Sequence, residues 1–237
     1  MDVESVPMRD VAPGIDVPDQ FGCELSYRTG WWVTACGELD LAARPQLDLV
    51  ADIIASGSDD VIVDLRGITF MDSVGLGFLV RLLRHAERME ADLAIVRGSE
   101  AVERIIAIAG LQPLLASIDA PSRTSAMPPE HAVIATDLSG EVVLWNRAAE
   151  GLYGWRSDEV LGHPITELTV GPCEQELAQE IMDSVRRSGR WEGEFTVRRS
   201  DGTTFRAHVR NELFGSRGTP EGLVGRSIGS AVLLAVS

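Results

Sequence analysis

The feature that most constrains the fold is an apolar strand signal that leads, through a short turn, into a long amphipathic helix. The strand signal is the run VIVDL at residues 61–65, which is β-branched and has the length of a buried strand. The helix signal is a set of apolar residues at helical spacing, Leu76, Leu79, Val80 and Leu83. Asp72 and Ser73 precede this set, and their side-chain oxygens are of the type that caps a first helical turn. We therefore expect the helix to begin near Ser73.

Strand and helix signals alternate through the N-terminal half of the chain. Two apolar runs, Cys23–Tyr27 and Trp31–Cys36, flank Gly30 and predict a hairpin. The elements that follow are a helix with Pro45 in its first turn, the strand and helix described above, a strand over 92–96 and a helix over 101–109. Strands that alternate with helices predict an α/β domain, a mixed sheet with packed helices, over residues 21–119.

Signals for neighbouring antiparallel strands dominate the C-terminal half. Two strands, 132–136 and 141–145, flank a turn that contains Gly140. The later elements are short helical stretches at 147–153, from 157 and at 174–187, and then three strands at 191–198, 204–213 and 223–228. This order predicts an α+β domain, an antiparallel sheet with short helices, over residues 131–237. We expect its apolar end, 231–236, to be buried at a dimer interface or against its own domain.

The length of 237 residues also suggests two domains, since a domain holds roughly 100 to 200 residues. Residues 120–130 contain Pro121, Pro128 and Pro129, which break helices and strands, and they predict a linker. Residues 1–20 are rich in proline and show no periodicity, so we expect a flexible N-terminal tail. Because the linker disfavours a continuous helix, coupling between the domains would need direct docking or self-association of the second domain.

Charge and cysteine content exclude several kinds of function. The chain has 21 Lys and Arg against 36 Asp and Glu, a net charge of -15, which disfavours binding to nucleic acid or to an anionic membrane. Its three cysteines, Cys23, Cys36 and Cys173, form no CxxC pair, so we expect a reducing compartment and no metal site. The acidic N-terminus lacks the apolar core of a signal peptide, and no apolar run is long enough to cross a membrane. We therefore expect a cytoplasmic protein.

Three enzyme signatures are missing from the sequence. Met71 stands where a GxSxG nucleophile motif around Ser73 would need glycine, and neither a GxxxxGK[ST] phosphate loop nor an HExxH motif occurs. Glu38 and Asp40 lie close together, but paired carboxylates in a loop are usually solvated or bind a partner. We therefore predict no catalytic residue.

The segment DLRGITFMDSVGLG, residues 64–77, resembles the phosphorylation loop of STAS domains in bacterial anti-sigma factor antagonists. Flanking segments at 37–47 and 102–115 match in the same order. The resemblance implies that an anti-sigma factor serine kinase phosphorylates Ser73 and that a phosphatase removes the phosphate. It also implies a partner-binding face made of Glu38, Asp40, Asp72, Ser73, Gly75 and Gly77. Val74 stands where the family commonly has a second Ser or Thr, so Ser73 would be the single acceptor; without the resemblance, Ser73 would be interpreted as an ordinary helix cap.

The segments at 133–155, 157–168 and 191–205 resemble a PAS domain that covers about residues 130–230. The resemblance implies a sensory or dimerisation module and leaves its ligand unknown, since PAS domains differ widely in what they bind. Ile165 stands where the light-sensing LOV subset carries its reactive cysteine, and we expect His163 in a surface turn rather than as a haem ligand. We therefore predict no cofactor.

These observations favour an anti-sigma factor antagonist that is controlled by phosphorylation of Ser73 and carries a PAS module, which could form a homodimer. A phosphate would add about -1.5 to -2 charge at a helix start that a partner must approach, and would block binding. The alternative hypothesis is a ligand-sensing PAS protein whose STAS domain is a non-phosphorylated scaffold in a multi-protein signalling complex. Incubation with a kinase and ATP, followed by mass spectrometry, separates the two.

Overall fold

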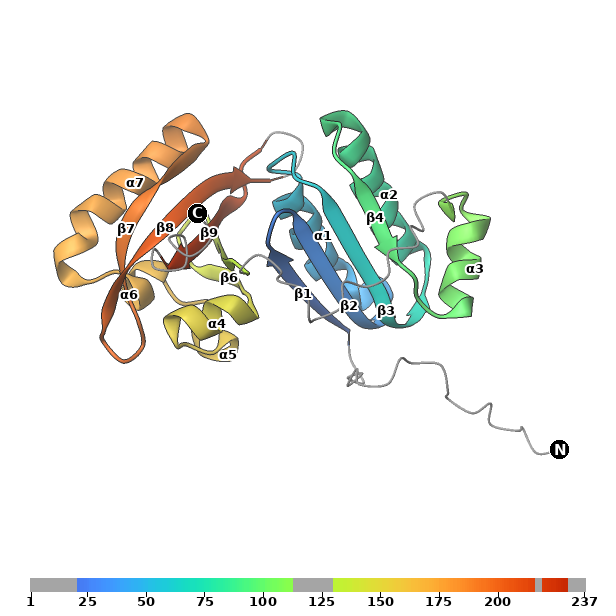
Figure 1. Cartoon of the computed structure of the whole chain (residues 1–237), viewed down its shortest axis with the longest axis horizontal. Helices are drawn as coiled ribbons and strands as arrows, with labels where there is room; N and C mark the ends of the chain where they lie inside the picture. Colours follow the sequence, from blue (N-terminus) through green and yellow to red (C-terminus); the bar gives the residue numbers. More distant parts are fainter. Residues whose placement is uncertain (1–20, 113–129, 216–218, 230–237) are drawn as a thin grey trace.

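The computed structural model describes residues 21–112, 130–215 and 219–229. These residues form two sheets that lie side by side, each with its own helices (Figure 1). The predictions for the tail at 1–20, for most of the linker at 120–130 and for the apolar run at 231–236 lie outside the described residues.

The first sheet is mixed. Its strands are β1 (Gly22–Tyr27), β2 (Trp31–Leu39), β3 (Val61–Met71) and β4 (Leu93–Val96), in the spatial order β1-β2-β3-β4. β1 and β2 are antiparallel, whereas β2, β3 and β4 run parallel. The connecting helices are the 3-10 turn η1 (Leu41–Ala43), α1 (Arg44–Ile54), α2 (Ser73–Met89) and α3 (Glu100–Ile108). The predicted α/β architecture is confirmed.

β2 and β3 are both longer than the sequence pattern indicated. β2 continues from Cys36 to Leu39, and β3 continues from Leu65 to Met71. The two strands pair through this extension, around register shifts between Thr34 and Cys36 and between Gly37 and Glu38. Gly37 adopts a positive φ of 83°, which glycine tolerates at no steric cost. The extension carries β3 directly to the start of α2.

The core of this domain lies between the sheet and its helices. Alternate residues of β2, beginning with Trp31 and Val33, are buried, as period-two geometry requires. They share one apolar cluster with Leu47 and Val50 of α1 and with Leu79 of α2. At roughly 1.5–3 kcal/mol for each large apolar side chain that is fully buried, this packing holds the start of α2 in a fixed position.

The second sheet is entirely antiparallel. Its strands are β5 (Ala132–Asp137), β6 (Val142–Trp145), β7 (Arg190–Arg198), β8 (Thr204–Phe214) and β9 (Gly222–Gly229), in the order β6-β5-β9-β8-β7. The helices are α4 (Arg147–Tyr153), α5 (Ser157–Val160), α6 (Ile165–Thr169), η3 (Pro172–Glu174) and α7 (Gln175–Ser188). The predicted α+β architecture is confirmed. Figure 1 shows α7 on the side of this sheet that faces away from the first sheet.

Candidate functional site

Ser73 is the first residue of α2 and its side chain is exposed to solvent. The helix is capped by the preceding residue, because Asp72 has an extended backbone and its Oδ1 accepts a hydrogen bond of 2.6 Å from the Val74 N–H. The interpretation of Ser73 as the cap is therefore wrong. Since Asp72 supplies the capping oxygen, the Ser73 hydroxyl takes no part in the cap and faces the surroundings of the protein.

The two glycines after Ser73 have different environments. Gly77 lies one turn further along the same face of α2; it is exposed, and a Cβ there would meet nothing within 4 Å. Gly75 is buried, and a Cβ there would lie 2.7 Å from Met71 Cγ and 2.8 Å from Leu39 Cβ. This corrects the prediction for Gly75, whose lack of a side chain permits close packing of α2 on the sheet rather than forming part of an accessible face.

The two acidic residues that were predicted to bind a partner lie at the end of β2, the strand that pairs with β3. Glu38 is exposed in β2, and Asp40 follows the strand, where its Oδ1 accepts a hydrogen bond of 2.8 Å from the Ala42 N–H. Two apolar side chains in the same region were not predicted. Phe70 is paired with Glu38 in the sheet register and is 48% exposed, and Leu41 is 67% exposed. Large apolar side chains with this exposure next to Ser73 are typical of a protein-binding surface.

A hollow of about 280 Å³ runs between α1 and α2 beside Ser73. Its lining residues are Arg44, Leu47, Asp48, Ser73, Val74, Gly77, Phe78 and Arg81. Arg81 is held within it, since its Nη1 lies 3.1 Å from Asp48 Oδ1 and its Nη2 pairs with Asp52. Burial raises the pKa of the Asp52 carboxyl, and the Arg81 charge opposes that rise. The side of Ser73 that faces α1 is therefore an open groove with fixed charges.

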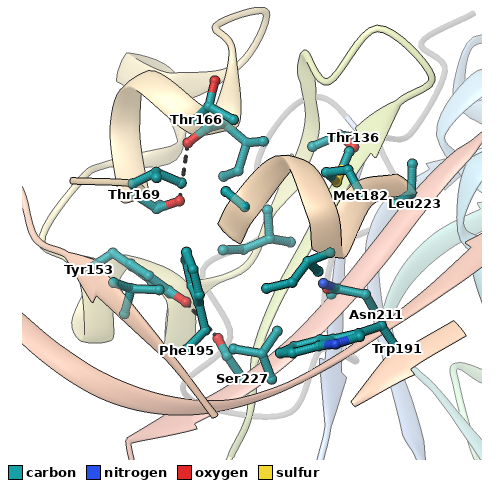
Figure 2. Close-up of a pocket in the computed structure, with 18 residues that line it drawn as sticks. Thr136, Tyr153, Thr166, Thr169, Met182, Trp191, Phe195, Asn211, Leu223 and Ser227 are labelled. Carbon is teal, nitrogen blue, oxygen red and sulfur yellow. Dashed lines mark hydrogen bonds between the residues drawn. The ribbon is translucent and has the colours of Figure 1, made fainter. Parts of the chain in front are cut away.

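The second domain encloses a cavity of about 120 Å³ between the inner face of its sheet and helices α6 and α7 (Figure 2). Most lining residues are apolar: Ile134, Ile165, Val170, Ala178, Ile181, Met182, Trp191, Phe195, Val197, Val209 and Leu223. The polar residues are Thr136, Tyr153, Thr166, Thr169, Asn211 and Ser227. A cavity of this kind accepts a small molecule that is mainly apolar.

The polar groups of the cavity are neutral, and one of them lacks a partner. Tyr153 and Ser227 share a hydrogen bond of 2.8 Å between their hydroxyl oxygens, which Figure 2 shows beside Phe195. Burial raises the pKa of Tyr153 to about 12, although the Ser227 hydroxyl opposes the rise. Among the described residues, Thr136 Oγ1 is buried without a hydrogen-bond partner. A buried hydroxyl in that state costs free energy that a hydrogen-bonding ligand would recover.

Ile165 and His163 stand at the positions that bear on a flavin or haem cofactor, and His163 lies at the surface as predicted. Ile165 lines the cavity, and His163 is exposed outside it. The residues that line the cavity, all of them in the described part of the chain, include neither His nor Cys. Across residues 21–112, 130–215 and 219–229, no cluster of three or more metal-ligating side chains occurs. No helix in these ranges has both the length and the apolar content needed to span a bilayer.

Comparison with known families and proteins agrees with the two halves of the structure. The STAS domain family matches residues 32–124, and the PAS fold matches residues 130–227. The anti-sigma-B factor antagonist of Staphylococcus epidermidis is 35% identical over 80 residues, which are 33% of this chain and 74% of that protein. The anti-sigma-B factor antagonist of Staphylococcus aureus strain NCTC 8325 is 32% identical over the same shares.

Among solved structures, the second half is similar to a PAS domain from Colwellia psychrerythraea. The identity is 28%, the TM-score is 0.39, and the match covers 42% of this chain and 85% of that chain. A LOV protein of Rhodobacter sphaeroides is 19% identical with a TM-score of 0.38, over 42% of this chain and 59% of that chain.

The fold and the two family matches define a signal-transduction protein with a STAS domain followed by a PAS domain. The chain belongs to the STAS family of anti-sigma factor antagonists.

Proposed function

We propose that this chain is a cytoplasmic anti-sigma factor antagonist whose STAS domain binds an anti-sigma factor serine kinase, and that this kinase phosphorylates Ser73. The observation that carries the proposal is the exposed hydroxyl of Ser73 at the start of α2, which Asp72 leaves free by capping the helix itself. The proteins that match the STAS half, the anti-sigma-B factor antagonists, point to the same class of partner.

Phosphorylation at this position would change binding without unfolding the domain. The N-terminus of α2 carries partial positive charge, so it tolerates a phosphate on Ser73. The phosphate would bring about -1.5 to -2 charge to a surface that contains the exposed side chains of Phe70 and Leu41. Those apolar side chains must lose their water when a partner binds, and a hydrated phosphate beside them opposes this. Removal of the phosphate by a phosphatase would restore binding.

The proposed partner surface comprises one cluster of residues around Ser73. Its members are Glu38, Asp40, Leu41, Phe70, Asp72, Ser73 and Gly77. Gly77 contributes open space, because nothing lies within 4 Å of the position that its Cβ would occupy. A partner backbone can therefore approach α2 one turn after the acceptor hydroxyl.

The test uses the kinase that co-purifies with the chain, incubated with ATP and the full-length protein. We expect one phosphate on the described part of the STAS domain in the wild type and none in Ser73→Ala, measured by peptide mass spectrometry. Ser99→Ala is the matched control, because Ser99 also stands at a helix start but uses its hydroxyl to accept from the Val102 N–H. Phosphate incorporation that persists at the same level in Ser73→Ala would refute the assignment.

The cavity favours a second role, in which the PAS domain senses a small neutral molecule. The unpartnered Thr136 hydroxyl supports this proposal, since a mainly apolar ligand with one hydrogen-bonding group would satisfy it. If the protein binds such a ligand while Ser73 stays unmodified with every co-purifying kinase, the STAS domain is a scaffold in a signalling complex instead. Thr136→Val is expected to weaken binding of a polar-headed ligand without changing the size of the cavity.

A further inference from the structure

A buried arginine joins the PAS domain to the STAS domain. Arg226 lies in β9, and its side chain is 3% exposed. Its Nη1 is 3.0 Å from Asp59 Oδ2, between α1 and β3 of the STAS domain, and its Nη2 is 2.7 Å from Glu212 Oε2 in β8 of the PAS sheet. One guanidinium therefore pairs with a carboxylate from each domain. Such a two-sided pairing fixes the orientation of Arg226 as well as its charge.

Aromatic side chains of the STAS domain surround the same guanidinium. Its carbon lies 4.2 Å from the ring centre of Tyr27 and 5.3 Å from that of Trp31. The Tyr27 hydroxyl donates a hydrogen bond of 2.9 Å to Asp59 Oδ1, so the tyrosine holds the carboxylate in place. We call these five residues, Tyr27, Trp31, Asp59, Glu212 and Arg226, the interdomain clamp.

Apolar packing surrounds the interdomain clamp. The apolar cluster of the STAS core includes four PAS residues, Val133, Ala135, Phe214 and Val224. The backbone also joins the domains, because the His131 N–H donates to the Tyr27 carbonyl at 2.9 Å. The STAS domain therefore covers the outer face of the PAS sheet around β5 and β9, whereas Arg206 and Glu194 on the outer face of β8 and β7 stay exposed.

β9 presents alternate residues to the cavity and to the STAS domain. Leu223, Gly225 and Ser227 line the cavity, whereas Val224 and Arg226 lie on the opposite face against the STAS domain. This alternation follows from the period of a strand, in which neighbouring side chains point to opposite sides. Ser227 forms a hydrogen bond with Tyr153 at the wall of the cavity, and the residue before it in the strand, Arg226, belongs to the clamp. A displacement of this backbone therefore acts on both sites.

We propose that β9 couples the PAS cavity to the STAS domain, so that the contents of the cavity set how firmly Arg226 holds Asp59. Of the two carboxylates that pair with Arg226, Glu212 belongs to the PAS sheet and Asp59 belongs to the STAS domain. The coupled element is thus a buried cation that pairs with one carboxylate of its own domain and one of the other domain. This inference concerns the two domains alone and does not depend on phosphorylation of Ser73.

Two tryptophans allow a direct test in the full-length protein. Trp31 belongs to the interdomain clamp, and Trp191 lines the cavity. Labelling with 5-fluorotryptophan gives a resonance for each of the five tryptophans of the chain, and Trp31→Phe and Trp191→Phe identify the two that are followed. Benzene is then added as an apolar probe of the cavity. We expect both resonances to shift with one shared saturation curve. A saturable shift of Trp191 with a stationary Trp31 would overturn the proposal.

Two variants distinguish coupling through the interdomain clamp from a general loss of rigidity in the protein. Asp59→Asn weakens the clamp from the STAS side, so we expect the Trp31 response to benzene to be reduced or lost while Trp191 still responds. The matched control is Arg206→Met, which removes an exposed β8 arginine that pairs with Glu194, and both responses should remain. An undiminished Trp31 response in Asp59→Asn would contradict the assigned route.

If benzene does not enter the cavity, a substitution in the cavity wall tests the same coupling. Ser227→Ala removes the hydrogen bond to Tyr153, and we expect the Trp31 resonance to shift in this variant without any ligand. Thr169→Val is its control, since Thr169 lines the same cavity from α6 and should leave Trp31 unchanged. An unmoved Trp31 resonance in Ser227→Ala, or equal shifts in both variants, would defeat the proposal.

Discussion

Replacing each of the two glycines of α2 by alanine should change stability in opposite directions. Alanine favours a helix interior over glycine by about 1 kcal/mol, and this gain is common to both positions. At Gly77 nothing opposes it, because the new methyl group meets no atom within 4 Å, so Gly77→Ala should stabilise the STAS domain by about 1 kcal/mol. At Gly75 the methyl would lie 2.7 Å from Met71 Cγ and 2.8 Å from Leu39 Cβ. Overpacking of this kind costs about 1–3 kcal/mol.

The gain in helix propensity cancels when the two variants are compared, because both of them share it. The difference in the free energy of unfolding between Gly77→Ala and Gly75→Ala should therefore equal the overpacking cost, about 1–3 kcal/mol. Urea unfolding gives this difference, and hydrogen exchange of α2 amides shows that it arises in that helix. If Gly75→Ala is as stable as Gly77→Ala, Met71 relaxes freely and the close-packing explanation of Gly75 is wrong. A second readout is independent of stability: Gly77→Ala should weaken kinase binding, because its methyl group occupies the open face beside Ser73.

Two further substitutions and one absorption spectrum test other parts of the structure. Burial lowers the pKa of the His85 imidazole below its usual value of 6.5, so the unfolded chain binds more protons than the folded chain when the pH falls below 6.5, and the free energy of unfolding should fall as well. His85→Gln can still donate a hydrogen bond to the Gly57 carbonyl and should flatten this pH dependence, which is measured as urea midpoints at pH values on both sides of 6.5. Arg226→Met removes the cation that pairs with Asp59, while Glu212 keeps Arg210 as a partner, so the free energy of unfolding measured with urea should fall by about 3 kcal/mol, the lower end of the range for a broken buried ion pair. The purified protein should be colourless, and a Soret or flavin band that disappears on denaturation would contradict this expectation.

Most of the fold could be predicted because its signals are local. The apolar run at 61–65 and the helical spacing after Ser73 gave the central strand and helix, and the structure has both. The end of β3 could not be predicted, because Arg66, Gly67 and Thr69 interrupt the apolar pattern. That part of the strand exists because β2 pairs with it, and pairing between distant strands is not a local property.

The candidate sites depended on information that the sequence does not carry. Gly75 and Gly77 are indistinguishable in the sequence, and only the positions of neighbouring atoms separate a packing role from an exposed one. Phe70 could be placed beside Glu38 only after the register of β2 and β3 was known. Arg226 is visible as a charge within an apolar strand, but its partner Asp59 is 167 residues away in the chain. No spacing rule links residues at that separation.

The shared cation has a consequence for the exchange of modules between proteins. This STAS domain carries a carboxylate, Asp59, whose counter-ion, Arg226, is supplied by the PAS domain. A foreign PAS domain fused at the same linker would need an arginine in the register of Arg226 and an acid in that of Glu212. Without them, Asp59 and Tyr27 would face a surface that does not complement them. Chimaeras built by joining linkers alone should therefore produce two tethered but uncoupled domains, whereas transplanting β8 and β9 together would carry the recognition surface with them.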